Sequence, residues 1–537
     1  MRHLIGFGGS VHDFATCVLG EDGRMVAIED ERLSRVRYAF GDPEPCRTSL
    51  EYCLRAVGHA PGDGLEFGAN DMLRGVIGVP ERDIVWMNHH LAHAMSVLFT
   101  SPFQEAAIVV ADGAGSVVSS TAAHDAHTHC RETTTWAWGR GNDIRTLGQV
   151  IGRKRGGPDS NDVSALMSNS LGDLYRAVTE AVGFGFLQAG KTMGLASYGD
   201  DRFVDRLMSA VELLPGGQFT IDVAGSGGVL QILKGIRRGS LEEDFDTNAA
   251  IAAAGQIVLE TVLFHVLQEV WEQTHCPNLC LAGGVALNCV FNGKIAERTP
   301  FRDVHVVFAP GDSGTAIGSA VHRYLSDGSC TTPFRLQTGP YLGRDYGRDA
   351  EMTGHQDRLP DEVLYRKVAS LLHQGKVVAW FQGGAEFGPR ALGHRSLLAD
   401  PTRAAMRPHL NRVKSREWFR PFAPVVIEKH RTDYFEGAHA SPYMQFSYPV
   451  KAGMRDRIPA VCHVDGTARL QSVDDWSSPE LAELTREFAR QGGPPVLLNT
   501  SLNLRGEPIV ETPRQALDAF AGADIDALVL CGRLLVK

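Results

Sequence analysis

The sequence feature that most constrains the fold is a pattern that occurs twice: an apolar strand, a glycine-rich loop with an acidic residue, and a returning strand. The first copy runs through LIGFGG, ATCVL and MVAIED, with HD and EDG between them, which predicts a β-meander. The second copy begins with EAAIVVADGAGS at residues 105–116 and continues through VVSSTAAH and TTTWAWG. Both copies place backbone N–H groups at the end of a buried strand, where they can face an anionic ligand.

Two further glycine loops follow, LAGGVALN at 281–288 and FAPGDSGTAIGSAV at 308–321. Each is predicted to lead into a helix, and Asp312 stands just before the second one. A glycine-rich hairpin alone is weak evidence, but four such loops are poorly explained as plain turns. The duplication, with helices between the copies, is typical of actin-like ATPase folds, in which two halves hold a nucleotide.

Length and composition limit the class of protein. A chain of 537 residues predicts two or three domains. The net charge of -10 argues against a nucleic-acid-coating protein, although a local basic cleft for phosphates is compatible with it. Residues 1–20 lack the pattern of a signal peptide, and Gln256 and Glu260 interrupt the most apolar long stretch. Together with ten cysteines that form no CxxC pair, this predicts a cytoplasmic protein that does not span a membrane.

The stretch NHHLAHAMSV at 88–97 places His89 and His93 one helical turn apart, with Asn88 as a plausible N-cap. Helical geometry puts both histidines on the face opposite the more apolar residues. Spacing alone leaves two interpretations, a metal-binding pair or a solvated, hydrogen-bonded face. A zincin is disfavoured because His90 stands where the general base Glu would be.

A denser histidine cluster, AHDAHTHC, is interpreted as a hairpin tip, because it lies between strand-like stretches and lacks the spacing of a structural zinc site. Its metal-ligating residue types are His124, His127, His129 and Cys130.

Residues around 325–347 are rich in Gly, Pro, Ser and Thr and are predicted to be a linker with little core of its own. Basic residues follow it among Phe, Pro and Gly, as in EFGPRALGHRS and KSREWFRPFAP. Guanidinium groups grip phosphate oxygens bidentately, so the set favours a pocket for a multiply anionic ligand; solvated surface charge is the alternative. The set comprises Arg390, Arg395, Lys414, Arg416, Arg420 and Arg469.

The motifs NHHLAHAMS, GKTMGLASYG, GGVALN, EFGPRALGHRS, KSREWFRPFAP, HVDGTARLQSV and LLNTSLNLRGEPIV occur in this order. With HDFA near the start, they resemble the ATP-dependent O-carbamoyltransferases of nodulation-factor and antibiotic biosynthesis, from about residue 4 to residue 535. The resemblance implies an α/β chain with an N-terminal actin-like (ASKHA, Kae-type) two-lobed domain over 1–340. A YrdC-like α/β domain would occupy 341–537.

The resemblance also implies two reactions. The C-terminal domain would use carbamoyl phosphate and ATP to form carbamoyl-adenylate, with Mg²⁺ as a candidate cofactor, and the N-terminal domain would transfer the carbamoyl group to a hydroxyl. Because carbamate decomposes quickly in water, an enclosed route and tight packing between the domains are expected. The residues implied to bind carbamoyl phosphate and ATP are Arg390, Lys414, Arg420, Arg469, Asn499 and Ser501.

In the transfer domain the resemblance implies Fe²⁺, with Mn²⁺ or Zn²⁺ as alternatives, held by His89, His93, Asp112 and Asp312. His12 would be the catalytic base, since imidazole titrates near neutral pH, and Asp13 would orient the loop or a substrate group. The residues implied to hold the adenylate are Gly113, Gly283, Gly284 and Asn288.

The chain departs from the family at Gly384 and Ala385, where Arg and a larger residue are common. Two other functions remain open: a tRNA threonylcarbamoyladenosine-type transferase, and an actin-like ATPase or kinase with structural histidines. The acidic net charge and the lack of a Lys/Arg-rich patch disfavour the first. The expected partner is a small hydroxylated acceptor, as in antibiotic tailoring, without nucleic acid or membrane, and a homodimer is the prior expectation.

Overall fold

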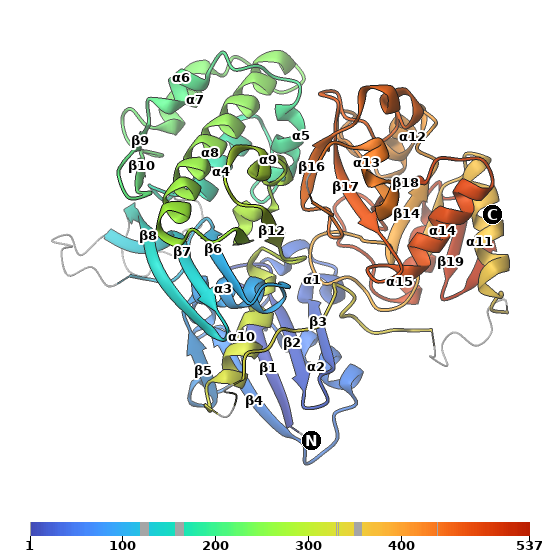
Figure 1. The fold of residues 1–537 in the computed structure, drawn as a ribbon, viewed down its shortest axis with the longest axis horizontal. Helices are drawn as coiled ribbons and strands as arrows, with labels where there is room; N and C mark the ends of the chain where they lie inside the picture. Colours follow the sequence, from blue (N-terminus) through green and yellow to red (C-terminus); the bar gives the residue numbers. More distant parts are fainter. Residues whose placement is uncertain are drawn as a thin grey trace.

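The N-terminal part of the chain contains two five-stranded mixed sheets with the same topology (Figure 1). The computed structural model describes residues 2–118, 128–155, 166–328, 330, 332–347, 357–437 and 439–537. In the first sheet β1, β2 and β3 pair antiparallel, and β4 and β5 join in parallel on the other side of β1. The strands are β1 Arg2–Gly8, β2 Ala15–Gly20, β3 Met25–Glu29, β4 Gly64–Asn70 and β5 Ile84–Met87.

The second sheet repeats this arrangement, with β6 in the place of β1 and the order β8-β7-β6-β11-β12. Its first three strands pair antiparallel, and β11 and β12 are parallel. The duplicated pattern seen in the sequence is thus confirmed as two matched sheets. Of the histidine-rich segment, His124 and His127 lie outside the described residues, and Cys130 is buried. The strands are β6 Glu105–Ala111, β7 Thr128–Arg140, β8 Asp143–Arg155, β11 Asn278–Ala282 and β12 Asp303–Val306.

Two helices, α3 (His89–Phe99) and α10 (Thr315–Leu325), pack between the two sheets. Glycines allow α10 to approach its neighbours closely: a Cβ at Gly6 of β1 would lie 2.0 Å from the carbonyl oxygen of Ala316, and one at Gly318 would lie 1.9 Å from that of Ala92. The first sheet also carries α1 (Asp30–Ser34) and α2 (Arg47–Val57).

We expect Gly318→Ala to destabilise the protein by about 1–3 kcal/mol, because a methyl group there overlaps the backbone of α3. Thermal unfolding checks this. Gly190→Ala is the matched control: Gly190 also lies in a helix, α5 (Ala189–Ala196), but no atom lies within 4 Å of its Cβ position. The control should leave stability unchanged or raise it by about 0.5–1 kcal/mol. Equal midpoints for the two variants would contradict the close packing.

A helical layer around α8 (Phe245–Thr274) covers the second sheet (Figure 1). Among the described residues, α8 alone is long and apolar enough to cross a membrane, but 78% of its most apolar window is buried inside the protein, as in a core helix. Its polar residues are paired, since Glu260 accepts hydrogen bonds from Gln256 and Lys294. The other elements of this layer are α4 Leu171–Ala181, α6 Val204–Met208, β9 Val211–Leu213, β10 Phe219–Ile221, α7 Val229–Ile236 and α9 Cys289–Arg298.

The C-terminal part of the chain forms a separate α/β unit on an eight-stranded sheet of order β16-β17-β15-β18-β14-β13-β19-β20. Apolar strands such as VAWF (β13) are buried on both faces. Its strands are β13 Val378–Phe381, β14 Arg395–Ala399, β15 Ala423–Ile427, β16 Phe446–Pro449, β17 Thr467–Val473, β18 Val496–Ser501, β19 Ala527–Leu530 and β20 Arg533–Val536. Its helices are α11 Asp361–His373, α12 Met406–Val413, α13 Arg431–Tyr434, α14 Pro479–Arg490 and α15 Pro513–Gly522.

Between α10 and α11 the described residues form no helix or strand. This predicted linker nevertheless packs: Leu342 accepts a hydrogen bond from the backbone of Ala27 (3.1 Å), and the Tyr341 ring stacks on His394 at 3.7 Å. The expectation of a linker with little core is therefore wrong for this segment, whose apolar side chains fill the space between the two units. The domain boundary at residue 340 stays a prediction.

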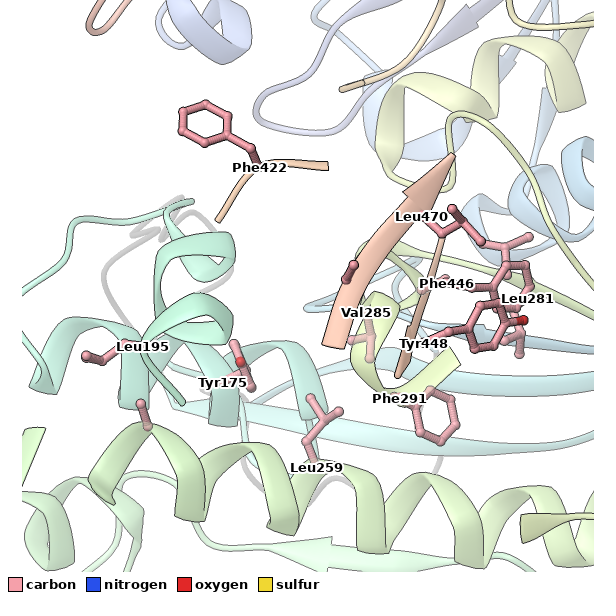
Figure 2. Packing of buried hydrophobic residues seen from close by; sticks show 14 of the residues in the cluster. Tyr175, Leu195, Leu259, Leu281, Val285, Phe291, Phe422, Phe446, Tyr448 and Leu470 are labelled. Atoms are coloured by element: carbon pink, nitrogen blue, oxygen red, sulfur yellow. The ribbon is translucent and has the colours of Figure 1, made fainter. Parts of the chain in front are cut away.

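The two units share a packed interface. The side chain of Asn292 donates to the Gln445 carbonyl (2.9 Å), and that of Gln445 donates to the Val307 carbonyl (3.0 Å). The tight packing expected between the domains is confirmed, as is the fold class: an actin-like two-lobed unit followed by an α/β unit. Figure 2 shows side chains of β16 and β17 beside those of β11 and α9, namely Phe446, Tyr448, Leu470, Leu281 and Phe291.

Candidate functional site

The helix α3 carries His89 and His93 into the space between the two sheets. It begins as predicted, with the side chain of Asn88 accepting a hydrogen bond from the Leu91 N–H (2.8 Å). The expectation that the histidines lie away from the core is wrong. Every residue of α3 except Leu91 is buried, because α10 and the second sheet pack against the helix.

Two aspartates complete a cluster around these imidazoles: Asp112, directly after β6, and Asp312, in the short 3-10 helix η5 (Asp312–Gly314) before α10. The two Nε2 atoms are 3.2 Å apart. Asp112 Oδ2 lies 3.3 Å from His93 Nε2 and 3.5 Å from His89 Nε2. Asp312 Oδ1 lies 3.6 Å from both. The structure thus brings together all four predicted metal ligands.

Neighbouring polar groups orient these side chains. Asn70 Oδ1 lies 3.2 Å from His89 Nδ1, so a proton on Nδ1 leaves the Nε2 lone pair directed to the cluster. The amide of Asn70 is itself fixed by hydrogen bonds to Gly9 and Thr315. Ser10 donates to Asp312 Oδ2 from the loop after β1. The outer partners therefore come from the first glycine loop and from α10.

The cluster is strongly coupled electrostatically. Burial lowers the pKa of His89, but Asp112 and Asp312 outweigh it and raise the pKa to about 10. Burial raises the pKa of Asp312, yet the two histidines hold it well below its ordinary value. His90, which faces Thr135 at 2.7 Å, has its pKa lowered to about 3 by burial and by the charge of His89. His90 is therefore neutral and stands outside the cluster.

The four residues fit a divalent transition metal. Two donor atoms about 2.1 Å from a common ion, at tetrahedral or octahedral angles, are about 3.0–3.5 Å apart, close to the spacings of these imidazole and carboxylate atoms. Asp112 Oδ2 is buried and makes no hydrogen bond in the described part of the chain. Two imidazoles and two carboxylates suit Fe²⁺, Mn²⁺ and Zn²⁺ alike.

We expect metal affinity to rise about tenfold per pH unit between roughly pH 7 and pH 9, because a cation must displace the proton that His89 holds with a pKa of about 10. Calorimetric titration of metal-stripped protein with Mn²⁺, in buffers of different ionisation enthalpy, measures both the affinity and the protons released. An affinity that is independent of pH would show that His89 is not a ligand.

His12 lies beside this cluster, in the loop between β1 and β2. The loop is closed by left-handed backbone at Gly9 and Asp13 and by a hydrogen bond from the Asp13 N–H to the Tyr38 carbonyl (2.8 Å). His12 Nδ1 is 3.1 Å from Asp13 Oδ2. Burial lowers the pKa of His12, but Asp13, Asp312 and Asp112 raise it to about 9. Asp13 thus holds His12 Nδ1 and, through its N–H, the loop itself; the catalytic roles of both residues stay predictions.

Three of the four predicted adenylate-binding residues gather around Asp112. The N–H of Gly113 donates to Asp112 Oδ1 (2.7 Å), and a Cβ at Gly284 would lie 3.1 Å from the same oxygen. Gly283 has φ +88°, and a Cβ there would lie 2.2 Å from the Ala111 carbonyl. These glycines allow the backbone to pack closely around Asp112, a candidate metal ligand.

Asn288 is engaged differently. Its Oδ1 accepts from the Phe291 N–H (3.0 Å), which caps α9, and its amide exchanges two hydrogen bonds with Gln256 of α8 (2.8 and 3.1 Å). The side chain therefore holds α9 against α8, and its carbonyl oxygen and one amide N–H are used within the fold.

A second site is a cluster of cations in the C-terminal unit, in which Lys414 is buried and the arginines are half-buried. Arg469 comes from β17, Arg390 from the loop before β14, and the others from the segment after α12. Buried Nε atoms of Arg390 and Arg469 make no hydrogen bond in the described part of the chain. Glu417 lies at the edge, paired with Lys191 (2.7 Å) and Arg420 (3.6 Å). We call this the cation cluster; it comprises Arg390, Lys414, Arg416, Arg420 and Arg469.

Burial lowers the pKa of every member of the cation cluster, and the charges of neighbouring cations lower it further for every member except Arg469. For Arg390, burial and then Arg469 lower the pKa to about 9. For Lys414, burial followed by Arg416 and Arg420 takes the pKa well below its ordinary value. Removing charges from water without pairing them is costly, so the cluster is suited to a ligand with several negative charges.

The remaining predicted residues support this cluster. Lys414 Nζ donates to Asn503 Oδ1 (2.8 Å) and to the Ser501 carbonyl, and the Ser501 hydroxyl donates to Asn503 (2.6 Å). Asn499 donates to the carbonyl of Ala391, next to Arg390 (3.2 Å). Asn499 thus holds the loop that carries Arg390, and Asn503 is a member of the site that the sequence did not predict.

Arg395 does not join the cation cluster. Its guanidinium lies 3.7 Å over the Phe381 ring and donates to the carbonyls of Gln382 and Gly383, so it is used within the fold. The sequence also missed Arg37 of the N-terminal unit, whose charge helps to lower the pKa of Lys414. The run DERLSRVRY at residues 30–38, with its three arginines, was the sequence signal that could have indicated this contribution.

The departure at Gly384 and Ala385 has a packing reason. A Cβ at Gly384 would lie 2.3 Å from the carbonyl oxygen of Gly343, and Ala385 is buried against the same residue. A larger side chain at either position would displace the segment that joins the two units.

Comparison with known proteins places both sites in one family. Two family models match, the carbamoyltransferase N-terminus over residues 73–321 and the carbamoyltransferase C-terminus over 369–537. Nodulation protein NolNO of Sinorhizobium fredii is 33% identical, over 98% of this chain and 79% of that protein. The chain belongs to the carbamoyltransferase family. Nodulation protein NolO of Bradyrhizobium diazoefficiens is 34% identical over 84% of this carbamoyltransferase and 79% of its own length.

The family resemblance read from the motifs is thus confirmed. All four candidate metal ligands and the whole cation cluster of this carbamoyltransferase lie within the matched ranges, whereas His12 precedes them. Among solved structures, full-length HypF in a phosphate- and nucleotide-bound form is 13% identical with a TM-score of 0.42, covering 61% of this chain and 56% of that one. Sua5 from P. abyssi is 14% identical with a TM-score of 0.24, covering 32% and 48%.

Proposed function

We propose that this carbamoyltransferase is an ATP-dependent O-carbamoyltransferase that forms carbamoyl-adenylate at the cation cluster and transfers the carbamoyl group to a hydroxyl at the His/Asp cluster. Water first cleaves carbamoyl phosphate to carbamate and phosphate. A carbamate oxygen then attacks the α-phosphorus of ATP and pyrophosphate leaves. The acceptor hydroxyl finally attacks the carbamoyl carbon, which releases AMP and the carbamate ester.

The observation that carries this proposal is the cation cluster, because its buried and half-buried, mutually repelling charges need an anion. Carbamoyl phosphate and ATP, with bound Mg²⁺, supply phosphate oxygens that guanidinium forks bind bidentately. Arg390 and Arg469 would hold the reacting phosphate and stabilise the charge that moves to the leaving group. Lys414, fixed by Ser501 and Asn503, would bind as a point charge.

For the transfer step, His89, His93, Asp112 and Asp312 would hold a divalent metal, Fe²⁺, Mn²⁺ or Zn²⁺. Such an ion acts as a Lewis acid toward the carbamoyl oxygen and offsets the charge of the two carboxylates. The backbone at Gly113, Gly283 and Gly284 would receive the adenylate beside Asp112.

His12 is proposed to exchange the proton of the acceptor hydroxyl. Its Nδ1 is held by Asp13, which leaves Nε2 for the acceptor. With a pKa of about 9, His12 is protonated at neutral pH. It would first lose the Nε2 proton to solvent, once a bound cation offsets the charges of Asp112 and Asp312 that raise its pKa, and Nε2 would then accept the hydroxyl proton.

The surroundings of His12 support an acceptor with an apolar flank, as in natural-product tailoring. The His12 ring meets the Phe186 ring edge to face at 5.8 Å, and the Phe40 ring meets the Phe186 ring edge to face at 6.4 Å. Phe40 is 49% exposed, and Val11, next to His12 in the chain, is 43% exposed. A hydroxylated molecule with an apolar face could cover these side chains while its hydroxyl reaches His12.

The test is pyrophosphate release from ATP, with and without carbamoyl phosphate, in the absence of an acceptor. Release that depends on carbamoyl phosphate, with free phosphate formed in equal amount, supports the proposal. Formation of ADP, or indifference to carbamoyl phosphate, would instead favour an actin-like ATPase or kinase. Mass-spectrometric screening of hydroxylated small molecules, with transfer RNA as a comparison, would then identify the acceptor.

A further inference from the structure

We propose that Arg32 of α1, a short helix of the N-terminal unit, and Arg35, which follows its last residue, are positioning residues for the activation site in the C-terminal unit. The inference rests on the proposed function, because it assigns Arg390 and Ser501 to carbamoyl phosphate and ATP. Neither arginine is a member of the cation cluster, and both lie outside the ranges that the family models match.

Arg32 holds the loop that carries Arg390. Its side chain is fully buried, and its Nη2 donates to the carbonyls of Gly388 (2.6 Å) and Glu386 (3.3 Å). On the same peptide segment, the Gly388 N–H donates to Glu29 Oε1 (2.5 Å), and Glu29 lies 3.6 Å from Arg32. The two side chains thus clamp Gly388 from both sides, two residues before Arg390.

The backbone of Gly388 has a conformation that L side chains rarely adopt (φ +109°) and that glycine adopts without strain. A Cβ there would lie 2.5 Å from the Phe308 carbonyl of the N-terminal unit. Inside the loop, Glu386 Oε1 accepts hydrogen bonds from the N–H groups of Leu392 (2.7 Å) and His394 (2.8 Å). Fixing residues 386–388 therefore fixes the whole turn around Arg390.

Arg35, one turn further along, holds the second loop of the activation site. Its guanidinium donates to the carbonyls of Pro508 and Ile509, both at 2.8 Å, and lies 3.5 Å from Glu507. The backbone carbonyl of Glu507 in turn accepts a hydrogen bond from the side-chain amide of Asn503 (2.7 Å), and Asn503 is the partner of Lys414.

The same helix is bonded to the transfer site. The Asp30 N–H donates to the carbonyl of Phe14, next to Asp13 (2.9 Å). The Tyr38 N–H donates to Glu31 (2.7 Å), and the Tyr38 carbonyl accepts from Asp13. One short helix therefore fixes the His12 loop, the Arg390 loop and the loop after Ser501 relative to one another. This arrangement would keep the two sites aligned for the passage of the adenylate.

Arg32→Lys keeps the charge that Glu29 needs but removes the fork that reaches two carbonyls. We expect the KM for carbamoyl phosphate to rise about 10- to 100-fold, as for a misplaced binding group, with a smaller change in kcat. In an Arg390→Ala background, Arg32→Lys should raise the KM for carbamoyl phosphate by less than about twofold more, since Arg32 acts through Arg390. Arg55→Lys, an exposed arginine on α2, is the matched control.

A second measurement does not require activity. Hydrogen exchange at residues 386–394 should be faster in Arg32→Lys than in wild type and unchanged in Arg55→Lys. If wild type releases no carbamoyl-phosphate-dependent pyrophosphate, the proposed function fails, and exchange still tests the clamp. Unchanged exchange, or a full and additive KM effect in the Arg390→Ala background, would overturn the positioning role of Arg32.

Discussion

Arg469→Ala is expected to lower carbamoyl-phosphate-dependent pyrophosphate release by about 10²–10³-fold, the usual cost of removing one charged donor from the reacting centre. Arg469 is half-buried on β17, and its buried Nε makes no hydrogen bond in the described part of the chain. Its charge also lowers the pKa of Arg390 and Arg416, as expected for groups that converge on one anion. The effect should appear in kcat as well as in KM.

Two comparisons make this measurement specific. Arg457→Ala removes an exposed arginine of the same unit and should leave release unchanged. Arg469→Gln keeps most of the side-chain volume, so an equal loss in this variant would exclude a packing defect. Thermal unfolding of all three variants verifies that the C-terminal unit remains folded. Full activity of Arg469→Ala would mean that the anion binds elsewhere.

Local patterns predicted the scaffold well. The strand and glycine-loop pairs became the two matched sheets, because an apolar run that ends in glycine has few alternatives once it is buried. The start of α3 at Asn88 and of the helix after Asp312 also followed from capping and glycine patterns. These are short-range properties that each segment carries by itself.

Properties that depend on tertiary neighbours were predicted less well. The face of α3 with His89 looked solvent-exposed, because nothing in that segment shows that α10, rich in small residues, covers it. Asn288 lies in the predicted loop, but its side chain bonds Gln256, 32 residues away in the sequence. Arg395 packs on the Phe381 ring and does not join the cation cluster. The meeting of the His pair with Asp112 and Asp312 came from the family resemblance, since spacing alone does not join three distant segments.

His93→Ala is expected to lower the rate of carbamoyl transfer by about 10³-fold or more, as for loss of a catalytic metal ion. The rate of pyrophosphate release should stay within about twofold of wild type. His93 Nε2 lies within 3.6 Å of the three other ligand atoms, and its removal leaves a buried gap between Asp112 and Asp312 that alanine cannot fill. Metal content by mass spectrometry should fall in parallel with transfer to an acceptor found by screening.

The adjacent histidine provides the control for this second effect. His90 lies on the same helix and is equally buried, but its Nδ1 is 2.7 Å from Thr135 and its pKa of about 3 keeps it neutral. His90→Gln should therefore retain metal and transfer activity even if its melting temperature falls. If His93→Ala lost pyrophosphate release and transfer together, the two reactions would share one site. Selective loss of transfer would support two separate sites, with carbamoyl-adenylate formation at the cation cluster and carbamoyl transfer at the His/Asp cluster, as proposed.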